Sequence, residues 1–574
     1  MTQRFRLALA QLNPIVGDPF GNADKALAAW REAKAAEADA LMLPELFLSA
    51  YPPEDLVLKP AFQDACRKAC DMLAEKTALG PAILIGLPWV ENGKLYNAFA
   101  VLDRGAVQSV RFKVDLPNYG VFDEKRVFEP GPLPGPVTIR GVRIGLPICE
   151  DIWQPDVVEC LAETGAEILL SPNGSPFRRH VRDERMAVAV PRVVESGLPL
   201  VYLNQVGGQD ELVFDGGSFA LNADAALAMQ LPTFREAVSI LDCEKGADGW
   251  SCRGEIALVE EGDEAVYAAC TLGLRDYVEK NGFKDVVLGL SGGIDSAICA
   301  AMAVDALGPE RVRCLMMPYR YTSPDSLKDA FACATALNVS CEIVPIEPVV
   351  AGFEAALAPL FEGLAPDITE ENLQSRARGT ILMSVSNKFG PMVVTTGNKS
   401  EMSVGYCTLY GDMNGGFNPI KDLYKMEVFR LSELRNRWRP QGSLGPVGEV
   451  IPVNIITKPP TAELRENQRD QDSLPPYDVL DDILSCLIES EMRVVDIVAR
   501  GHSLDLVKMV ERLLYLAEYK RRQSAPGVKV TQRSFGRDRR YPIVNRFRDP
   551  GDGPYLADAG PAPKGAARLD VVDF

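Results

Sequence analysis

The chain has 574 residues, a length that exceeds a single hydrophobic core and favours two large domains. Hydrophobic residues make up 47% and charged residues 24%, which is ordinary for a folded globular chain and excludes long disordered tracts. The formal net charge of −18 disfavours a nucleic-acid partner, whereas a small anionic substrate stays compatible with locally concentrated basic residues.

The N-terminal residues are expected to form a strand rather than a signal or membrane segment. Gln11 and Asn13 interrupt the first apolar run early, and no later segment approaches a transmembrane length. We therefore expect a cytoplasmic protein with no membrane partner. The 13 cysteines show no metal-ligand spacing, which indicates buried thiols in a reducing compartment rather than a disulfide framework or a zinc site.

The first 245 residues alternate short apolar strands with helical stretches, a pattern typical of an α/β domain. A helix is expected over residues 23–38, with Asn22 as its cap. Several strands end at Pro, Glu, Cys or Asn, so polar groups should collect at strand ends, where α/β folds keep their sites. The expected strands cover residues 5–12, 40–44, 82–88, 143–148, 167–172 and 199–204.

Three of these polar residues supply the parts needed for acyl transfer without histidine: Glu45, Lys113 and Cys149. A free thiol has a pKa of about 8.5, so Cys149 needs a neighbouring base or cation to act as a nucleophile. Glu45 could carry the proton and later activate water, while Lys113 could stabilise the thiolate and the oxyanion. A buried structural thiol is the alternative for Cys149. Of the only two histidines, His180 is a competing base and His502 has no catalytic context.

This arrangement resembles the Glu-Lys-Cys triad of the nitrilase (carbon–nitrogen hydrolase) superfamily. Residues 116–124 and 173–177 resemble in particular the glutaminase domain of NAD synthetases. The resemblance implies an α-β-β-α sandwich in which Cys149 forms a thioester with L-glutamine. It also implies glutamine binding by Tyr119, Ser175 and, with a looser spacing, Arg182.

A second α/β pattern follows an irregular stretch of the chain. We interpret residues 1–245 as the first domain, 246–262 as a linker, 263–540 as the second domain and 541–574 as a peripheral, poorly packed tail. The second domain should begin with a helix near 263–280. Its expected strands predict a doubly wound parallel sheet and cover residues 285–290, 312–318, 341–346 and 391–398.

The first strand of the second domain runs into a glycine-containing loop that ends at Ser296 and is followed by a helix. Glycines let the backbone approach a phosphate, and free N–H groups with the positive end of the helix dipole favour an anion. The loop lacks the Gly-Lys-Ser/Thr ending of a Walker P-loop, which disfavours a kinase or GTPase. The alternative without a binding function is a simple tight turn between a strand and a helix. The candidate ATP-binding residues are Gly289, Leu290, Ser291, Gly292, Gly293, Ile294, Asp295 and Ser296.

The loop resembles that of the ATP pyrophosphatase superfamily, and five later blocks resemble NAD synthetase: residues 371–379, 395–401, 408–413, 473–477 and 518–523. The resemblance covers roughly residues 265–540. It implies that ATP converts the carboxylate of deamido-NAD to an acyl-adenylate, from which ammonia displaces AMP. Thr396 would contact ATP, and Asp295 and Glu401 would supply the oxygen ligands of Mg²⁺. The implied deamido-NAD contacts are Asn372, Glu401, Asp412 and Lys520, with Lys399 as a weaker candidate.

Together the two halves predict a glutamine-dependent NAD synthetase that passes ammonia between its sites, and long enzymes of this family imply a homo-oligomer. Two alternatives stay open. One is another glutamine-dependent ligase with the same ATP loop, although GMP synthetase, for example, uses a Cys-His glutaminase and histidines are scarce here. The other is an amidase or nitrilase whose second half only binds nucleotides, which the intact loop and Glu401 disfavour.

Overall fold

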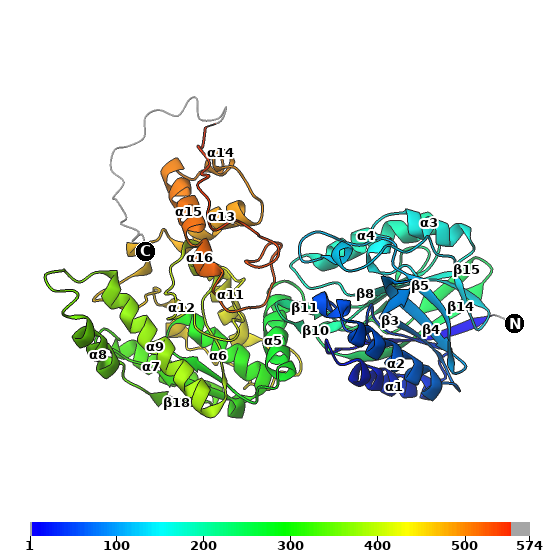
Figure 1. The fold of residues 1–574 in the computed structure, drawn as a ribbon, viewed down its shortest axis with the longest axis horizontal. Helices are drawn as coiled ribbons and strands as arrows, with labels where there is room; N and C mark the ends of the chain where they lie inside the picture. The colour runs from blue at the N-terminus through cyan, green and yellow to red at the C-terminus, as the bar shows by residue number, and fades with distance from the viewer. Residues whose placement is uncertain (1–2, 553–574) are drawn as a thin grey trace. The chain divides into compact units, whose positions relative to one another are not determined.

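The computed structural model describes residues 3–552. The chain divides into two compact units, one ending at Glu261 and the next beginning at Gly262. Across the described residues, every helix is too short or too polar to span a lipid bilayer. Figure 1 shows helices and strands in both units, with the first unit coloured blue to green and the second green to red. The predicted α/β class is therefore confirmed.

The first unit contains two large sheets. The seven-stranded sheet has the order β15 (Gly249–Arg253), β14 (Ala237–Gly246), β1 (Arg4–Gln11), β2 (Ala40–Met42), β3 (Ala82–Glu91), β4 (Lys94–Asp103), β5 (Ala106–Phe112). The six-stranded sheet has the order β13 (Leu227–Gln230), β12 (Phe219–Leu221), β9 (Leu200–Asn204), β8 (Ile168–Asn173), β7 (Val142–Gly145), β6 (Val137–Ile139). A separate hairpin pairs β10 (Val206–Gln209) with β11 (Leu212–Asp215).

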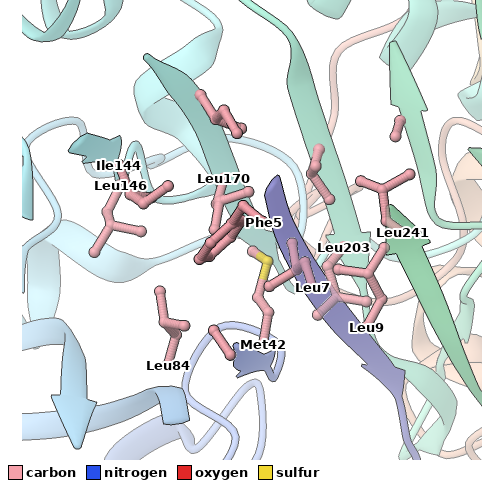
Figure 2. Packing of buried hydrophobic residues seen from close by; sticks show 14 of the residues in the cluster. Phe5, Leu7, Leu9, Met42, Leu84, Ile144, Leu146, Leu170, Leu203 and Leu241 are labelled. Atoms are coloured by element: carbon pink, nitrogen blue, oxygen red, sulfur yellow. The ribbon is translucent and has the colours of Figure 1, made fainter. Parts of the chain in front are cut away.

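The core of this unit lies between the two large sheets. Alternate residues of both sheets form one buried cluster there (Figure 2), including Phe5, Leu7, Leu9, Leu170 and Leu203. The intervening residues face outward: Ala8 and Ala10 pack with the helices α1 (Pro19–Ala35) and α2 (Pro60–Lys76). On the smaller sheet, Leu169 packs with α3 (Asp156–Glu163) and α4 (Val181–Ser196). The predicted α-β-β-α sandwich is therefore confirmed.

The expected strands of the first domain correspond to the two parallel sets, β1-β2-β3 and β7-β8-β9. The antiparallel strands were not expected, because many of their residues are partly or fully exposed and their apolar runs are broken, as in β5 and β15. The predicted cap of the first helix is wrong. Helix α1 begins at Pro19, where the Asp18 side chain accepts a hydrogen bond from the Gly21 N–H, and Asn22 is buried inside the helix.

The segments assigned as linker and tail differ from the structure in part. Residues 246–253 belong to the hairpin β14-β15, where Trp250 and Cys252 are buried in the core. The described end of the tail packs on the second unit: the ring of Tyr541 stacks on that of Tyr515, and the Asp549 carboxylate accepts a hydrogen bond from the Val494 N–H. The remaining residues of the predicted tail, 553–574, lie outside the described residues.

The second unit is built on a four-stranded parallel sheet. Its order is β18 (Ser340–Ile343), β17 (Val312–Met316), β16 (Val286–Gly289), β19 (Met392–Val393). The chain adds β17 and β18 on one side of β16 and later adds β19 on the other side. Such a change in strand order leaves a crevice at the carboxyl ends of β16 and β19. Helix α6 (Ile294–Leu307) follows β16, and α9 (Ile368–Phe389) packs on Val287, Leu315 and Val393. These features confirm the predicted doubly wound sheet.

The other helices of the second unit surround this sheet and form the helical part that follows it (Figure 1). They are α5 (Gly262–Lys280), α7 (Pro324–Leu337), α8 (Glu347–Leu357), α10 (Lys399–Val404), α11 (Lys425–Arg437), α12 (Val453–Thr457), α13 (Tyr477–Ile488), α14 (Val494–Val498), α15 (Leu504–Leu516) and α16 (Glu518–Arg521).

Candidate active sites

The first unit brings Glu45, Lys113 and Cys149 together in a buried cluster. Glu45 lies just after β2, Lys113 directly follows β5, and Cys149 begins the short 3-10 helix Cys149–Ile152 after β7. Glu45 and Lys113 are fully buried and Cys149 is 6% exposed. The charges of both partners affect the pKa of the Cys149 thiol, so the three predicted groups lie within electrostatic reach of one another.

Lys113 bridges two carboxylates in this cluster. Its ammonium donates to Glu45 Oε1 at 2.7 Å and to Glu124 Oε1 at 2.8 Å, and the Tyr51 hydroxyl also donates to Glu124 Oε1, at 2.8 Å. Burial alone would lower the pKa of Lys113, but Glu124 and Glu45 outweigh it and hold that pKa well above its usual range. Lys113 is therefore a permanent cation. The sequence analysis included Glu124 only as the last residue of the block 116–124 and assigned it no role, because its contacts with Lys113 and Tyr51 are tertiary. We call Glu45, Lys113, Glu124 and Cys149 the thiol cluster.

Cys149 has a backbone and an environment that differ from those of an ordinary cysteine. Its φ angle is 49°, in the left-handed region that non-glycine residues seldom adopt outside tight turns and functional sites. Burial raises the pKa of its thiol well above the usual value, the Glu45 charge raises it further, and Lys113 opposes both. The sulfur therefore rests as a thiol at neutral pH. Attack on a carbonyl carbon requires a base that removes this proton. The candidate for this base is Glu45, the buried carboxylate that pairs with Lys113.

The three residues predicted to bind glutamine make different contacts in the structure. Tyr119 is half-exposed, and its hydroxyl donates to the Glu150 carboxylate at 3.0 Å, next to Cys149 in the chain. The Ser175 hydroxyl accepts a hydrogen bond from the buried Arg185 Nε at 3.1 Å. Arg182 instead contacts Glu261 and Gln230. The arginine that touches Ser175 is therefore Arg185, three positions after the predicted one.

His180 occupies a different environment from the thiol cluster. Its side chain is exposed at the residue that precedes helix α4. A general base for a buried thiol must itself lie in the buried region around the sulfur. Glu45 is fully buried and its charge acts on the Cys149 thiol, so it is the better candidate. His502 hydrogen-bonds Asp482 at 2.6 Å in the second unit.

The second unit holds a cavity of about 1370 Å³ beyond the carboxyl ends of β16 and β19. Seven of the eight predicted loop residues line it, with Ser291 and Gly293 among them, as do Thr396, Asn372, Glu401, Asp412 and Lys520. The hydroxyl groups of Ser291 and Ser296 lie 3.1 Å apart, and the Gly293 N–H donates to Ser291 Oγ at 3.2 Å. The loop is thus held by its own side chains at the start of α6, where the helix dipole favours an anion.

Gly292 is the loop residue that does not line the cavity. Its φ angle is +83°, and an added Cβ would lie 2.2 Å from the Ser326 carbonyl oxygen. Gly292→Ala is therefore expected to displace the loop and to weaken ATP binding at least about tenfold. Calorimetric titration with Mg-ATP measures this affinity. Gly352→Ala is the control, because an added Cβ there would meet no atom within 4 Å. Equal ATP affinity of both folded variants would contradict the expectation.

The two predicted metal ligands lie side by side with a cation between them. The Lys425 ammonium pairs with Asp295 Oδ2 at 2.5 Å and with Glu401 Oε1 at 3.0 Å, and the Asn398 amide donates to Asp295 Oδ1 at 2.9 Å. Burial raises the pKa of Glu401, the Asp295 carboxylate adds to this, and Lys425 opposes it. Two hard-oxygen ligands at the phosphate loop fit Mg²⁺, which usually takes one or two carboxylates together with substrate phosphates. Sequence reasoning missed Lys425.

The described residues contain no group of three or more His, Cys, Asp or Glu side chains arranged to hold a metal. A metal at Asp295 and Glu401 would therefore take its other ligands from phosphates and water.

Of the remaining residues predicted to contact deamido-NAD, Asn372, Asp412 and Lys520 line the cavity and Lys399 does not. Asn372, on α9, accepts a hydrogen bond from the Thr408 hydroxyl at 2.9 Å, and Asp412 Oδ1 accepts from the Thr408 N–H at 2.8 Å. The Lys520 ammonium donates to two backbone carbonyls of the cavity wall. Lys399 is the exception, because its side chain is fully buried and pairs with Asp422 at 2.8 Å. It supports the fold instead of facing the cavity.

Charged side chains of both signs line the cavity. The basic ones are Arg376, Arg378, Lys425, Lys458, Lys508, Arg512 and Lys520. The acidic ones are Asp295, Glu371, Glu401, Asp412, Glu463, Asp470, Asp472 and Asp505. Burial lowers the pKa of Arg378 to about 10, which still leaves it charged at neutral pH. The cavity as a whole therefore carries no excess of positive charge, and an anionic substrate would meet individual basic side chains of its wall.

Comparison with known proteins gives matches along most of the chain. A family model described as carbon-nitrogen hydrolase matches residues 6–250, and one described as NAD synthase matches residues 266–524. The chain is 54% identical over 550 residues to a protein of Rhodobacter capsulatus named glutamine-dependent NAD(+) synthetase, which covers 96% of this chain and 100% of the relative. A Xanthomonas campestris protein of the same name is 47% identical over 551 residues, covering 94% and 98%.

Among solved structures, the glutamine-dependent NAD+ synthetase of Acinetobacter baumannii in complex with adenosine diphosphate has a TM-score of 0.76 and 43% identity. The match covers 95% of this chain and 99% of that one.

Proposed function

The chain belongs to the family of glutamine-dependent NAD(+) synthetases, and from that premise we propose how its residues divide the reaction. The enzyme amidates deamido-NAD to NAD at the expense of ATP, with glutamine as the nitrogen donor. The first unit carries the glutaminase reaction and the second unit carries the ligase reaction. A separate site for each reaction is consistent with the thiol cluster in one unit and the large cavity at the glycine-containing loop in the other.

In the glutaminase reaction, Glu45 removes the Cys149 proton as the sulfur attacks the carboxamide carbon of glutamine. Lys113, held as a cation by Glu45 and Glu124, stabilises the negative charge that develops on the carbonyl oxygen. Glu45 then protonates the leaving ammonia and later activates the water that releases glutamate. Tyr119 and Ser175 bind the amino-acid end of glutamine, with Arg185 orienting the Ser175 hydroxyl.

In the ligase reaction, the N–H groups of the loop from Ser291 to Ser296 hold the ATP phosphates. Asp295 and Glu401 would hold Mg²⁺ together with these phosphates, and the bound metal would neutralise part of the phosphate charge. Thr396 contacts ATP. Deamido-NAD lies along the part of the cavity lined by Asn372, Asp412 and Lys520. Its carboxylate is adenylated, because AMP is a better leaving group than oxide, and ammonia then displaces AMP.

Three further expectations belong to this proposal. Ammonia travels between the two sites without release to bulk water, since water competes with it for the acyl-adenylate. The enzyme assembles as a homo-oligomer. It acts in the cytoplasm, an expectation supported by the cysteines, all 13 of which are free thiols.

One observation supports this division of labour above the others: Glu45, Lys113 and Cys149 are buried together in the first unit, whereas the loop from Ser291 to Ser296 lines a cavity of about 1370 Å³ in the second. Incubation of the purified enzyme with glutamine, Mg-ATP and deamido-NAD should yield NAD, AMP and glutamate in equal amounts. An amidase with a non-catalytic second half would form glutamate without AMP. Formation of ADP in place of AMP would contradict the adenylation step.

A further inference from the structure

A buried asparagine joins the two carboxylates of the thiol cluster. Asn97, on β4, is 1% exposed, and its amide nitrogen donates to Glu45 Oε1 at 2.7 Å and to Glu124 Oε2 at 3.3 Å. An amide nitrogen has two donor hydrogens, and both are used by these contacts. Asn97 and Lys113 therefore bridge the same pair of carboxylates, one without charge and one with it.

The two oxygens of Glu45 meet different numbers of donors. Oε1 accepts from both Lys113 and Asn97, at 2.7 Å each. Oε2 accepts from the Gly174 backbone N–H at 2.8 Å. Because a carboxylate oxygen has about two acceptor sites, Oε1 is saturated and Oε2 retains one free site. A proton that arrives at Glu45 must therefore bind Oε2.

The amide oxygen of Asn97 indicates that this residue is not present for packing alone. Its Oδ1 atom is buried and has no hydrogen-bond partner in the described part of the chain. A buried acceptor without a partner lowers stability, so the amide is a poor choice for packing alone. Its value lies in the two hydrogen bonds made by the nitrogen.

We propose that Asn97 is a positioning residue of the glutaminase reaction, which saturates Glu45 Oε1 together with Lys113 and so assigns proton transfer to Oε2. The inference rests on the proposed role of Glu45. In acylation, the Cys149 proton moves to Oε2 as the carbon–sulfur bond forms, and then to nitrogen as the carbon–nitrogen bond breaks. In hydrolysis, water gives a proton to Oε2 as its oxygen attacks, and sulfur takes that proton as the carbon–sulfur bond breaks.

Asn97→Leu should separate this role from a structural one. The kcat of glutamine hydrolysis should fall at least about tenfold, while KM for glutamine changes less than about twofold. Ammonium-supported NAD synthesis should stay at the wild-type rate. Asn97→Asp is the second variant for the case in which the leucine variant folds poorly. It keeps the shape of the side chain and removes the two N–H donors, so at most one of the two hydrogen bonds can be remade by a protonated carboxyl group, and kcat should again fall.

Asn22→Leu is the matched control. Asn22 is a buried asparagine of the same unit whose amide donates only to the backbone carbonyls of Ile15 and Leu48. This variant should lose stability without a change in kcat. Wild-type kcat in both Asn97 variants, or a rise in KM alone, would overturn the inference. Glu45→Gln identifies the failing step: retained glutaminase activity there refutes the proposed role of Glu45, whereas its loss beside active Asn97 variants refutes only the role of Asn97.

Discussion

Replacing Cys149 with alanine is expected to abolish glutamine-supported NAD synthesis and to leave ammonium-supported synthesis intact. The thiol is the atom that forms the acyl intermediate, and loss of a nucleophile typically lowers kcat by about 10⁴-fold or more. The ligase residues lie in the other unit, beyond Gly262, so external ammonium should reach a working site. Steady-state rates of NAD formation with each nitrogen source measure both arms.

Cys66→Ala is the control for this experiment, because Cys66 is also a buried thiol of the first unit but lies on helix α2. It should support both reactions. Loss of both reactions in a folded Cys149→Ala protein would show that the two units do not divide the chemistry as proposed. Retention of glutamine-supported synthesis would remove Cys149 from the role of nucleophile.

Asp295→Ala is expected to disable both nitrogen sources, with a fall in kcat of at least about 100-fold. The substitution removes one of the two proposed metal ligands and leaves Lys425 paired with Glu401 alone. Because adenylation precedes the attack of ammonia, no nitrogen source can bypass this loss. The measurement is NAD and AMP formation with glutamine and, separately, with ammonium.

Asp325→Ala supplies a matched control, since Asp325 is also an acidic residue in the first turn of a helix, α7, but is exposed and lies outside the cavity lining. Its rates should equal those of the wild type. Full ammonium-supported activity of Asp295→Ala would contradict its role as a metal ligand. A magnesium titration adds a second readout, because a lost ligand should raise the Mg²⁺ concentration needed for half-maximal rate.

The parallel strands were the part of the fold that the sequence predicted well. A strand buried on both faces, such as β9, appears as an uninterrupted apolar run with a polar residue at its end. The hairpin β14-β15 could not be recognised in the same way, because β15 alternates exposed and buried residues over only five positions. Residues 246–253 therefore read as a linker although they complete a sheet.

Among the residues of the candidate sites, too, some could be predicted from the sequence and others could not. Residues at strand ends in ordered motifs, such as Glu45, Cys149 and Asp295, were placed by the motif itself. Residues that act through a tertiary contact were not. Arg185 lies about one helical turn after Arg182 on nearly the same face of α4, so the position along the helix axis decides which of the two meets Ser175, and the sequence does not give that position. The roles of Glu124, Asn97 and Lys425 depend on partners that lie 11 to 130 positions away in the chain, so even Glu124, which belongs to the block 116–124, was given no role.

The raised pKa of the Cys149 thiol has a consequence for the survival of the enzyme in the cell. Peroxides and electrophiles attack the deprotonated form of cysteine, so a sulfur that stays protonated between turnovers is a poor target for them. Inactivation by such agents should then depend on events that expose or ionise the sulfur, not on the time that the enzyme waits for glutamine. In the proposed mechanism, inertness at rest and reactivity during turnover are compatible, because Glu45 removes the thiol proton in the same step in which the sulfur attacks the amide carbon.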